Sequence, residues 1–182
     1  MSESPSHSVL QFWFQELEPA SWWKKDDQLD ALIQQKFKSL HQQAIRNELF
    51  EWRSTAKGAL AEVIVIDQFS RNIYRGKPES FAYDALALAL SQQAIHQGFD
   101  QELPNVERSF LYLPFMHSES AIIHKEAVKL YTALGNPQNL EFELKHKAII
   151  DQFGRYPHRN TLLGRTSTEA EIEFLQQPGS SF

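Results

Sequence analysis

Apolar residues recur every three or four positions along most of the chain, which is the period of an amphipathic α-helix. The stretch 27–52 carries its apolar side chains along one face. The stretch 56–73 is apolar nearly all round, so it predicts a central, buried helix. Further helices are expected over residues 9–17, 80–98, 137–154 and 166–177, and over 104–134 with a break near Pro114 and a restart after Ser118.

No segment shows sustained alternation of apolar and polar residues between hairpin turns, so no sheet is predicted. We therefore expect an all-α fold of about seven to nine helices arranged as antiparallel hairpins. The hairpins would pack as a tetratricopeptide-like right-handed superhelix or as a compact bundle. A chain of 182 residues is expected to form a single helical domain, 1–182, with flexible ends at 1–7 and 177–182.

Two segments share a motif in which an aspartate precedes an arginine by four positions. The first is VIDQFSRNIYRG, residues 65–76, and the second is IIDQFGRYPHRN, residues 149–160. Residues four apart lie one turn above each other on a helix, so Asp67 is expected to form a structural ion pair with Arg71. The buried helix makes such a partner necessary, because an isolated carboxylate is costly in an apolar interior.

The two copies differ after the shared arginine. In the second copy, Asp151 is expected to form the corresponding structural ion pair with Arg155. Gly154 and Pro157 then end the helix, so the polar residues at 158–160 are expected on a loop. Loops often carry the side chains that bind ligands. The divergence between the copies therefore indicates where function is to be sought.

Composition narrows the classes of function. The chain has no cysteine, which excludes disulfides and cysteine nucleophiles and fits a reducing compartment. The N-terminal segment lacks a basic region before its short apolar run, and no apolar run is long enough to span a membrane. We therefore expect a cytoplasmic protein without membrane binding. The net charge of −5 argues against general nucleic-acid binding.

Local clusters of basic residues nevertheless suit the recognition of a small anion or an acidic peptide. Arginine forms paired hydrogen bonds with carboxylate and phosphate groups, and histidine and asparagine add further donors. The residues expected to bind such a ligand are Arg71, Arg75, His146, Arg155, Arg159, Asn160 and Arg165. Our first hypothesis is therefore a helical domain with a polar, Arg- and His-rich central site.

Two other hypotheses stay open. A hydrolase that cleaves a phosphate or acyl bond could use His117, Glu119 and His158 as catalytic acid–base groups. The sequence requires no cofactor for this, although a divalent metal ion could assist. Alternatively, the helices form a scaffold that offers a concave surface to a protein partner. No phosphate-binding loop, dinucleotide fingerprint or GxSxG motif is present.

Several motifs together resemble those of one family. They are WF near the start, DQFSRNIYRG, FAYD, LPFMHSE and FGRYPHRNTLLGR. Over roughly residues 8–176, the chain resembles a bacterial family of uncharacterised proteins with an all-helical, tetratricopeptide-like fold. The resemblance implies the fold. It implies no reaction, cofactor or catalytic residue.

Overall fold

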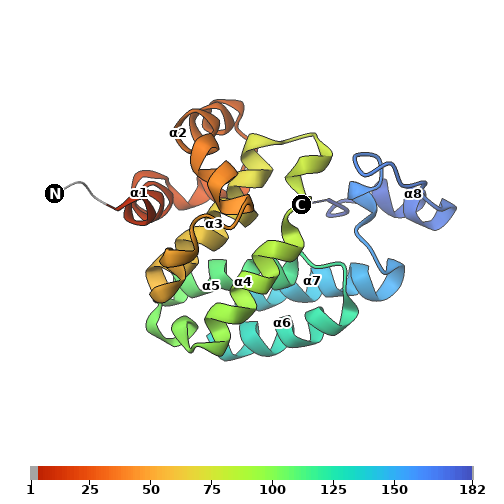
Figure 1. The fold of residues 1–182 in the computed structure, drawn as a ribbon. Helices are drawn as coiled ribbons and strands as arrows, with labels where there is room; N and C mark the ends of the chain where they lie inside the picture. Colours follow the sequence, from red (N-terminus) through yellow and green to blue (C-terminus); the bar gives the residue numbers. More distant parts are fainter. Residues whose placement is uncertain (1–3, 182) are drawn as a thin grey trace. The chain divides into compact units, whose positions relative to one another are not determined.

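The computed structural model describes residues 4–181, and within this range the secondary structure consists of eight α-helices and short 3₁₀ and π turns, with no strand (Figure 1). The predicted all-α fold is thus confirmed. The described residues divide into two compact units. Unit 1 contains residues 4–75 and 79–114, and unit 2 contains residues 76–78 and 115–181.

The first helix, α1 (Pro5–Gln11), begins earlier than the hydrophobic pattern predicts. Ser4 caps it, because the Ser4 side chain accepts a hydrogen bond from the His7 N–H at 3.3 Å. A π turn (Phe12–Glu16) continues the helix. Within the end expected to be flexible, 1–7, helical structure therefore starts at Pro5, and residues 1–3 lie outside the described range.

Helix α2 (Asp27–Ile45) begins as predicted but ends well before the predicted residue, Trp52. Asp26 caps its first turn by accepting hydrogen bonds from two main-chain N–H groups. After the helix, Asn47 adopts a left-handed conformation (φ 59°), which asparagine tolerates better than most residues. The chain therefore turns there, and a 3₁₀ turn (Phe50–Ser54) leads into the next helix.

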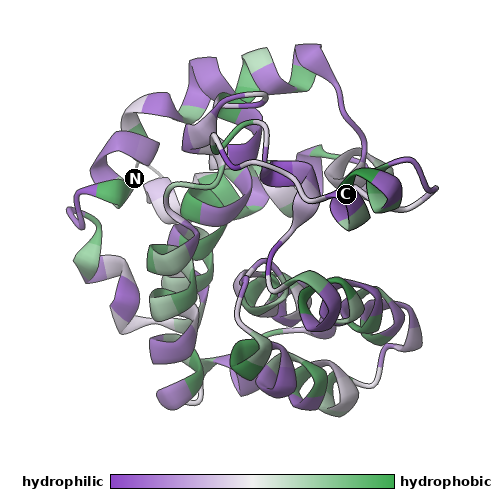
Figure 2. Ribbon diagram, turned by 90° about the vertical axis from the view of Figure 1, so that its right-hand side faces the viewer, coloured by the Kyte–Doolittle hydropathy of each residue, from purple (hydrophilic) through white to green (hydrophobic). Residues whose placement is uncertain are grey.

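Helix α3 (Ala56–Ile73) has the bounds that the pattern predicts and forms the centre of unit 1. It is buried on nearly every side and packs against α1, α2 and α4 (Asp84–His96). Burial of each large apolar side chain stabilises the fold by about 1.5–3 kcal/mol. Along the other helices, hydrophilic and hydrophobic residues both recur (Figure 2), as expected of helices with one buried face.

Helix α5 (Asn105–Met116) runs through Pro114, where the pattern predicts a break. Proline lacks an N–H group and removes one helical hydrogen bond. Because Pro114 lies in the last turn, the helix needs to extend only two residues beyond it before it ends. Ser118 follows the helix, and the next helix begins after Ser120.

Unit 2 is built on a hairpin of two packed helices, α6 (Ala121–Leu134) and α7 (Pro137–Phe153). The last helix, α8 (Glu169–Leu175), begins later than predicted. Its N-cap is Thr168, which forms a capping box with Glu171: each side chain accepts a hydrogen bond from the other's main-chain N–H. Residue 182, in the other end expected to be flexible, lies outside the described range.

Candidate functional site

Residues 154–168 connect α7 to α8 and carry most of the polar side chains of the second motif; we call this segment the arginine loop. α7 ends because Gly154 adopts a left-handed conformation (φ 70°) that residues with a side chain rarely take. A 3₁₀ turn (Pro157–Arg159) follows. The loop therefore leaves the helix where Gly154 and Pro157 predict, and it returns to the α8 cap at Thr168.

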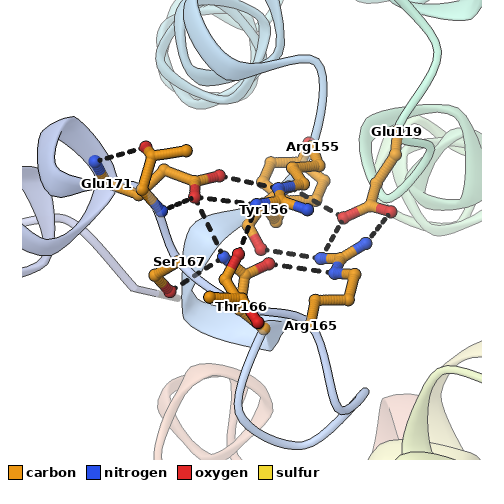
Figure 3. Close-up of polar contacts among 9 residues, drawn as sticks. Glu119, Arg155, Tyr156, Arg165, Thr166, Ser167 and Glu171 are labelled. Atoms are coloured by element: carbon orange, nitrogen blue, oxygen red, sulfur yellow. Dashed lines mark hydrogen bonds and ion pairs between the residues drawn. The ribbon is translucent and has the colours of Figure 1, made fainter.

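Arg155 links the arginine loop to α8 through an ion pair with Glu171. Its Nε and Nη2 atoms donate to the two carboxylate oxygens of Glu171 at 2.7 and 2.8 Å, and Nη2 also donates to the Thr166 carbonyl at 2.9 Å (Figure 3). Glu171 is buried. The hydrogen bond from Arg155 is the main cause that lowers the pKa of Glu171 to about 2.

This pairing corrects one prediction from the motif. Asp151 forms its ion pair with Lys147, one turn earlier on α7, and not with Arg155. The four-residue spacing brings side chains together only within a helix. Because α7 ends at Phe153, the Arg155 side chain lies beyond the helix and reaches α8 instead.

Arg165 holds the carboxylate of Glu119, which lies just before α6. Arg165 Nη1 and Nη2 donate to the two Glu119 oxygens at 2.7 and 2.9 Å, and the Tyr156 main-chain N–H donates to Glu119 Oε1 at 2.8 Å (Figure 3). Two neutral acceptors orient the guanidinium group. Its Nε donates to Asn160 Oδ1 at 2.9 Å and its Nη2 donates to the Tyr156 carbonyl at 3.1 Å.

The surroundings of Glu119 favour its ionised form. Burial alone would raise the pKa of this carboxyl. The hydrogen bonds from Arg165 and from the Tyr156 N–H, together with the charges of Arg159 and Arg165, outweigh burial and lower the pKa below its ordinary value. The arginine loop thus places a positive electrostatic potential at the Glu119 carboxylate.

The Tyr156 ring lies at the centre of a cluster of titratable side chains. The rings of His124, His146 and His158 have centroids 6.3, 5.8 and 5.6 Å from the Tyr156 centroid. The guanidinium carbon of Arg159 lies 4.7 Å from the same centroid, over the ring face, which favours a cation–π interaction. Arg159 is itself buried.

Main-chain carbonyls at the end of α5 receive two donors from this cluster. The Tyr156 hydroxyl donates to the Met116 carbonyl at 2.5 Å, and Arg159 Nη2 donates to the His117 carbonyl at 3.1 Å. His117 and His158 are half-buried. Two residues predicted as catalytic, His117 and Glu119, therefore lie in the connection between α5 and α6, where the arginine loop contacts them.

A buried chain of hydrogen bonds continues from Tyr156 through His124 to Glu143. His124 Nδ1 lies 2.7 Å from Glu143 Oε1, and His124 Nε2 lies 2.8 Å from the Ser118 carbonyl and 3.2 Å from the Tyr156 hydroxyl. A carbonyl can only accept, so Nε2 carries a proton, and a second proton lies between Nδ1 and Glu143. Burial raises the pKa of Glu143, and His124 partly offsets this.

Two of the predicted ligand-binding residues, His146 and Asn160, are buried and form hydrogen bonds with other residues of unit 2. His146 Nδ1 donates to the Phe142 carbonyl at 2.7 Å, and burial lowers the pKa of His146 to about 3, so its ring is neutral. Asn160 orients Arg165 and donates to Ser167 Oγ at 3.0 Å. Asn160 thus supports the site by orienting Arg165, whereas His146 packs beside the Tyr156 ring.

The arginines of the first motif belong to unit 1 and join its helices. Arg71 donates to the two Asp84 oxygens at 3.0 and 3.1 Å and lies 3.3 Å from Asp67 Oδ1, the partner that the spacing predicts. Arg75 donates to Asp30 of α2 through Nε and Nη2. In unit 1, both arginines therefore form ion pairs with carboxylates.

No group of three or more His, Asp or Glu side chains in residues 4–181 is arranged to hold a metal ion. The described part of the chain thus supplies no ligand set for the divalent metal considered with His117, Glu119 and His158.

The pattern of the sequence does not predict the central place of Tyr156 or the role of Glu143. Tyr156 looks like a spacer within the motif, because its partners lie on α5, α6 and α7. For Glu143 a signal exists. Glu143 and His146 are three residues apart and share a face with the buried Ile150, so two titratable groups interrupt an apolar stripe.

Comparison with known proteins places the chain in a family. A model described as "Bacterial protein of unknown function (DUF924)" matches residues 9–179. The chain belongs to the DUF924 family. This confirms the family resemblance expected from the motifs. The solved structure of a protein of unknown function from Agrobacterium tumefaciens is 34% identical in sequence to this DUF924 chain, with a TM-score of 0.90, over 94% of this chain and 96% of that one. No curated protein matches the chain.

In the part of this DUF924 chain that the structure describes, no helix combines the length and the apolar character needed to cross a membrane.

Proposed function

We propose that this DUF924 protein binds a small anionic group, a carboxylate or a phosphate, either on a small molecule or on an acidic peptide. The binding site is the arginine loop of unit 2. One observation carries the proposal: three N–H donors, from Arg165 Nη1, Arg165 Nη2 and the Tyr156 main chain, converge on one carboxylate at 2.7 to 2.9 Å. Such paired, charge-assisted donors are what recognition of a carboxylate or phosphate requires.

The donors are held in place by neutral groups. Asn160 Oδ1 and the Tyr156 carbonyl both accept from Arg165 and fix the plane of its guanidinium group. A donor that is oriented before binding loses less conformational entropy when a ligand arrives. The lowered pKa of Glu119 supports the same conclusion, because the potential that stabilises this carboxylate also favours other anions.

His117 and His158 are half-buried; His117 lies two residues before Glu119, and the His158 ring centroid lies 5.6 Å from that of Tyr156. Even a neutral imidazole presents one N–H donor, and a protonated one presents two. His117, His124 and His158 lie close enough to His146 for their charges to contribute to its lowered pKa. We therefore include His117 and His158 in the anion site and assign Arg155, His146 and Asn160 to its support.

A hydrolase is the second candidate, and the chain Tyr156–His124–Glu143 is the observation that favours it. A hydroxyl, an imidazole and a carboxylate in this order move a proton in many hydrolases, but here His124 Nε2 already carries one and donates it to the Ser118 carbonyl. In addition, the Tyr156 hydroxyl is buried and donates to the Met116 carbonyl, and Glu119 is held ionised, which does not suit a general acid. The geometry therefore supports binding better than catalysis.

Isothermal titration at constant ionic strength tests the proposed function. The ligands are inorganic phosphate, succinate and a short acidic peptide, with a basic peptide of equal length as the negative control. We expect saturable binding of an anion, weakened about tenfold or more by Arg165→Lys, which keeps the charge but loses the paired donors. Arg46→Lys is the matched control, because Arg46 is an exposed arginine in unit 1. Equal affinities for the two variants, or no binding of any anion, would contradict the proposal.

A further inference from the structure

We infer that the arginine loop is a carboxylate receptor which the chain fills with its own Glu119, and that a ligand carboxylate binds by displacing Glu119. The inference rests on the proposed function and adds to it the ligand class and an internal competitor. The motivating geometry is the complete set of bonds at Glu119: both of its oxygens accept from Arg165, and Oε1 also accepts from the Tyr156 N–H.

The receptor fits a planar group with two oxygens. Arg165 Nη1 and Nη2 each donate to a different oxygen of the same carboxylate, as parallel bonds from a planar guanidinium group do. Two further N–H groups of Arg165, on Nε and Nη2, donate to the Asn160 side chain and the Tyr156 carbonyl. Neither of these acceptors is charged, so in this set of bonds Glu119 supplies the negative charge and a ligand carboxylate would replace it one for one.

Glu119 is placed where exchange is easy. Its side chain is 27% exposed and that of Arg165 is 23% exposed, so water and small anions can reach the pair. Water therefore offers both groups competing partners, which limits the net stability that this partly exposed pair contributes. Glu119 also lies in the connection between α5 and α6, so its side chain can leave without unwinding a helix.

The ion pair of Arg155 and Glu171 differs from that of Arg165 and Glu119, because Glu171 cannot easily leave. The Glu171 side chain is only 3% exposed. It also accepts a hydrogen bond from the main-chain N–H of Thr168, the N-cap residue of α8. Displacing Glu171 would therefore cost the α8 capping box as well as the ion pair. Of the two carboxylates held by the loop, Glu119 is the exchangeable one.

Displacement also couples the ligand to the connection between α5 and α6. In the same connection, the His117 carbonyl accepts from Arg159 and the Ser118 carbonyl accepts from His124. Release of Glu119 removes the ionic link between this connection and the arginine loop. A bound carboxylate would thus change how firmly the connection is held, while the receptor itself stays occupied.

Removal of the internal carboxylate tests the inference. Acetate and formate are titrated into the wild type, Glu119→Ala and Glu119→Gln at constant ionic strength, with affinity and melting temperature as readouts and phosphate as the tetrahedral comparison. Glu126→Ala is the matched control, because Glu126 is an exposed glutamate of α6 paired with Lys129. We expect both Glu119 variants to bind acetate at least tenfold more tightly than the wild type, and acetate to restore the melting temperature of Glu119→Ala more than that of Glu126→Ala. If Glu119→Ala does not fold, Glu119→Gln, which keeps the shape without the charge, gives the comparison.

The outcomes separate this inference from the proposed function. Binding by both proteins, tighter in the Glu119 variants, supports both. Equal binding by the wild type and the variants overturns displacement and leaves the proposed function standing. Binding by the variants alone supports Glu119 as the internal occupant, but it overturns both its displacement by these ligands and the proposed function for them. Binding by neither overturns both, and tighter binding of phosphate than of acetate by the variants overturns the carboxylate class.

Discussion

The Tyr156 hydroxyl donates to the main-chain oxygen of Met116, 2.5 Å away, and so ties the arginine loop to the end of α5. Tyr156→Phe removes this donor and leaves a buried carbonyl without it. We expect the free energy of unfolding to fall by about 1–3 kcal/mol, measured by urea denaturation. Tyr83→Phe, at a half-buried tyrosine of unit 1, is the control and should have little effect. A Tyr156→Phe protein as stable as the wild type would show that this bond does not hold the loop.

Acid should weaken the link between Arg155 and Glu171. The pKa of Glu171 is about 2 in the folded protein and near 4.5 when unfolded, so the unfolded state binds the proton first. The stabilisation is complete above pH 4.5 and is lost as pH falls toward 2. Glu171→Gln should therefore be less stable than the wild type at pH 7, and the difference should shrink below pH 4.5. Thermal unfolding across this range measures it, and a difference that stays constant down to pH 2 would contradict the account.

His146 should also make the stability of the protein depend on pH, in a higher pH range than Glu171 does. Burial holds its folded pKa at about 3, whereas the unfolded value is 6.5, so stability falls as pH drops from 6.5 toward 3. The slope is roughly 1.4 kcal/mol per pH unit for one such histidine. We expect His146→Gln to lose this part of the slope and His96→Gln, on α4, to keep it. Chemical denaturation at several pH values decides, and an unchanged slope in His146→Gln would refute the assignment.

In unit 1, loss of Arg71 should be severe because Asp67 is buried. Arg71→Met leaves the Asp67 and Asp84 carboxylates without their guanidinium partner, and Asp67 is only 1% exposed. We expect a loss of about 3–5 kcal/mol in the free energy of unfolding, against about 0–1 kcal/mol for Arg46→Met on the surface. Adding Asp67→Asn to Arg71→Met should recover part of the loss, because the uncompensated charge is removed. Additive effects of the two changes would contradict a direct ion pair.

The helices that could be predicted from sequence are those whose pattern is local. The eighteen residues of α3 are apolar nearly all round, so the bounds of this helix follow from the pattern alone. The pair Asp67–Arg71 was predictable for the same reason, since both residues lie within one helix. The early end of α2 was not predictable, because it depends on one asparagine in a left-handed conformation.

For the candidate site, the sequence predicts which types of residue take part, but not which residues contact each other. The second motif indicates arginines and histidines on a loop, and the loop is there. The ion-pair partners of these residues could not be predicted, because Glu119 and Arg165 lie 46 positions apart and no spacing rule connects them. The same holds for Arg155, which pairs with Glu171 across 16 positions once the helix has ended.

The most direct test of anion binding at the arginine loop is a nuclear magnetic resonance titration of the ¹⁵N-labelled protein with acetate at constant ionic strength. The resonances to follow are the Tyr156 main-chain amide and the Arg165 Nε–H. We expect both resonances to shift saturably with one shared dissociation constant, and Arg165→Lys to abolish the response of the Tyr156 amide. Acetate-dependent shifts confined to other residues, with both of these resonances unmoved, would contradict anion binding at this loop.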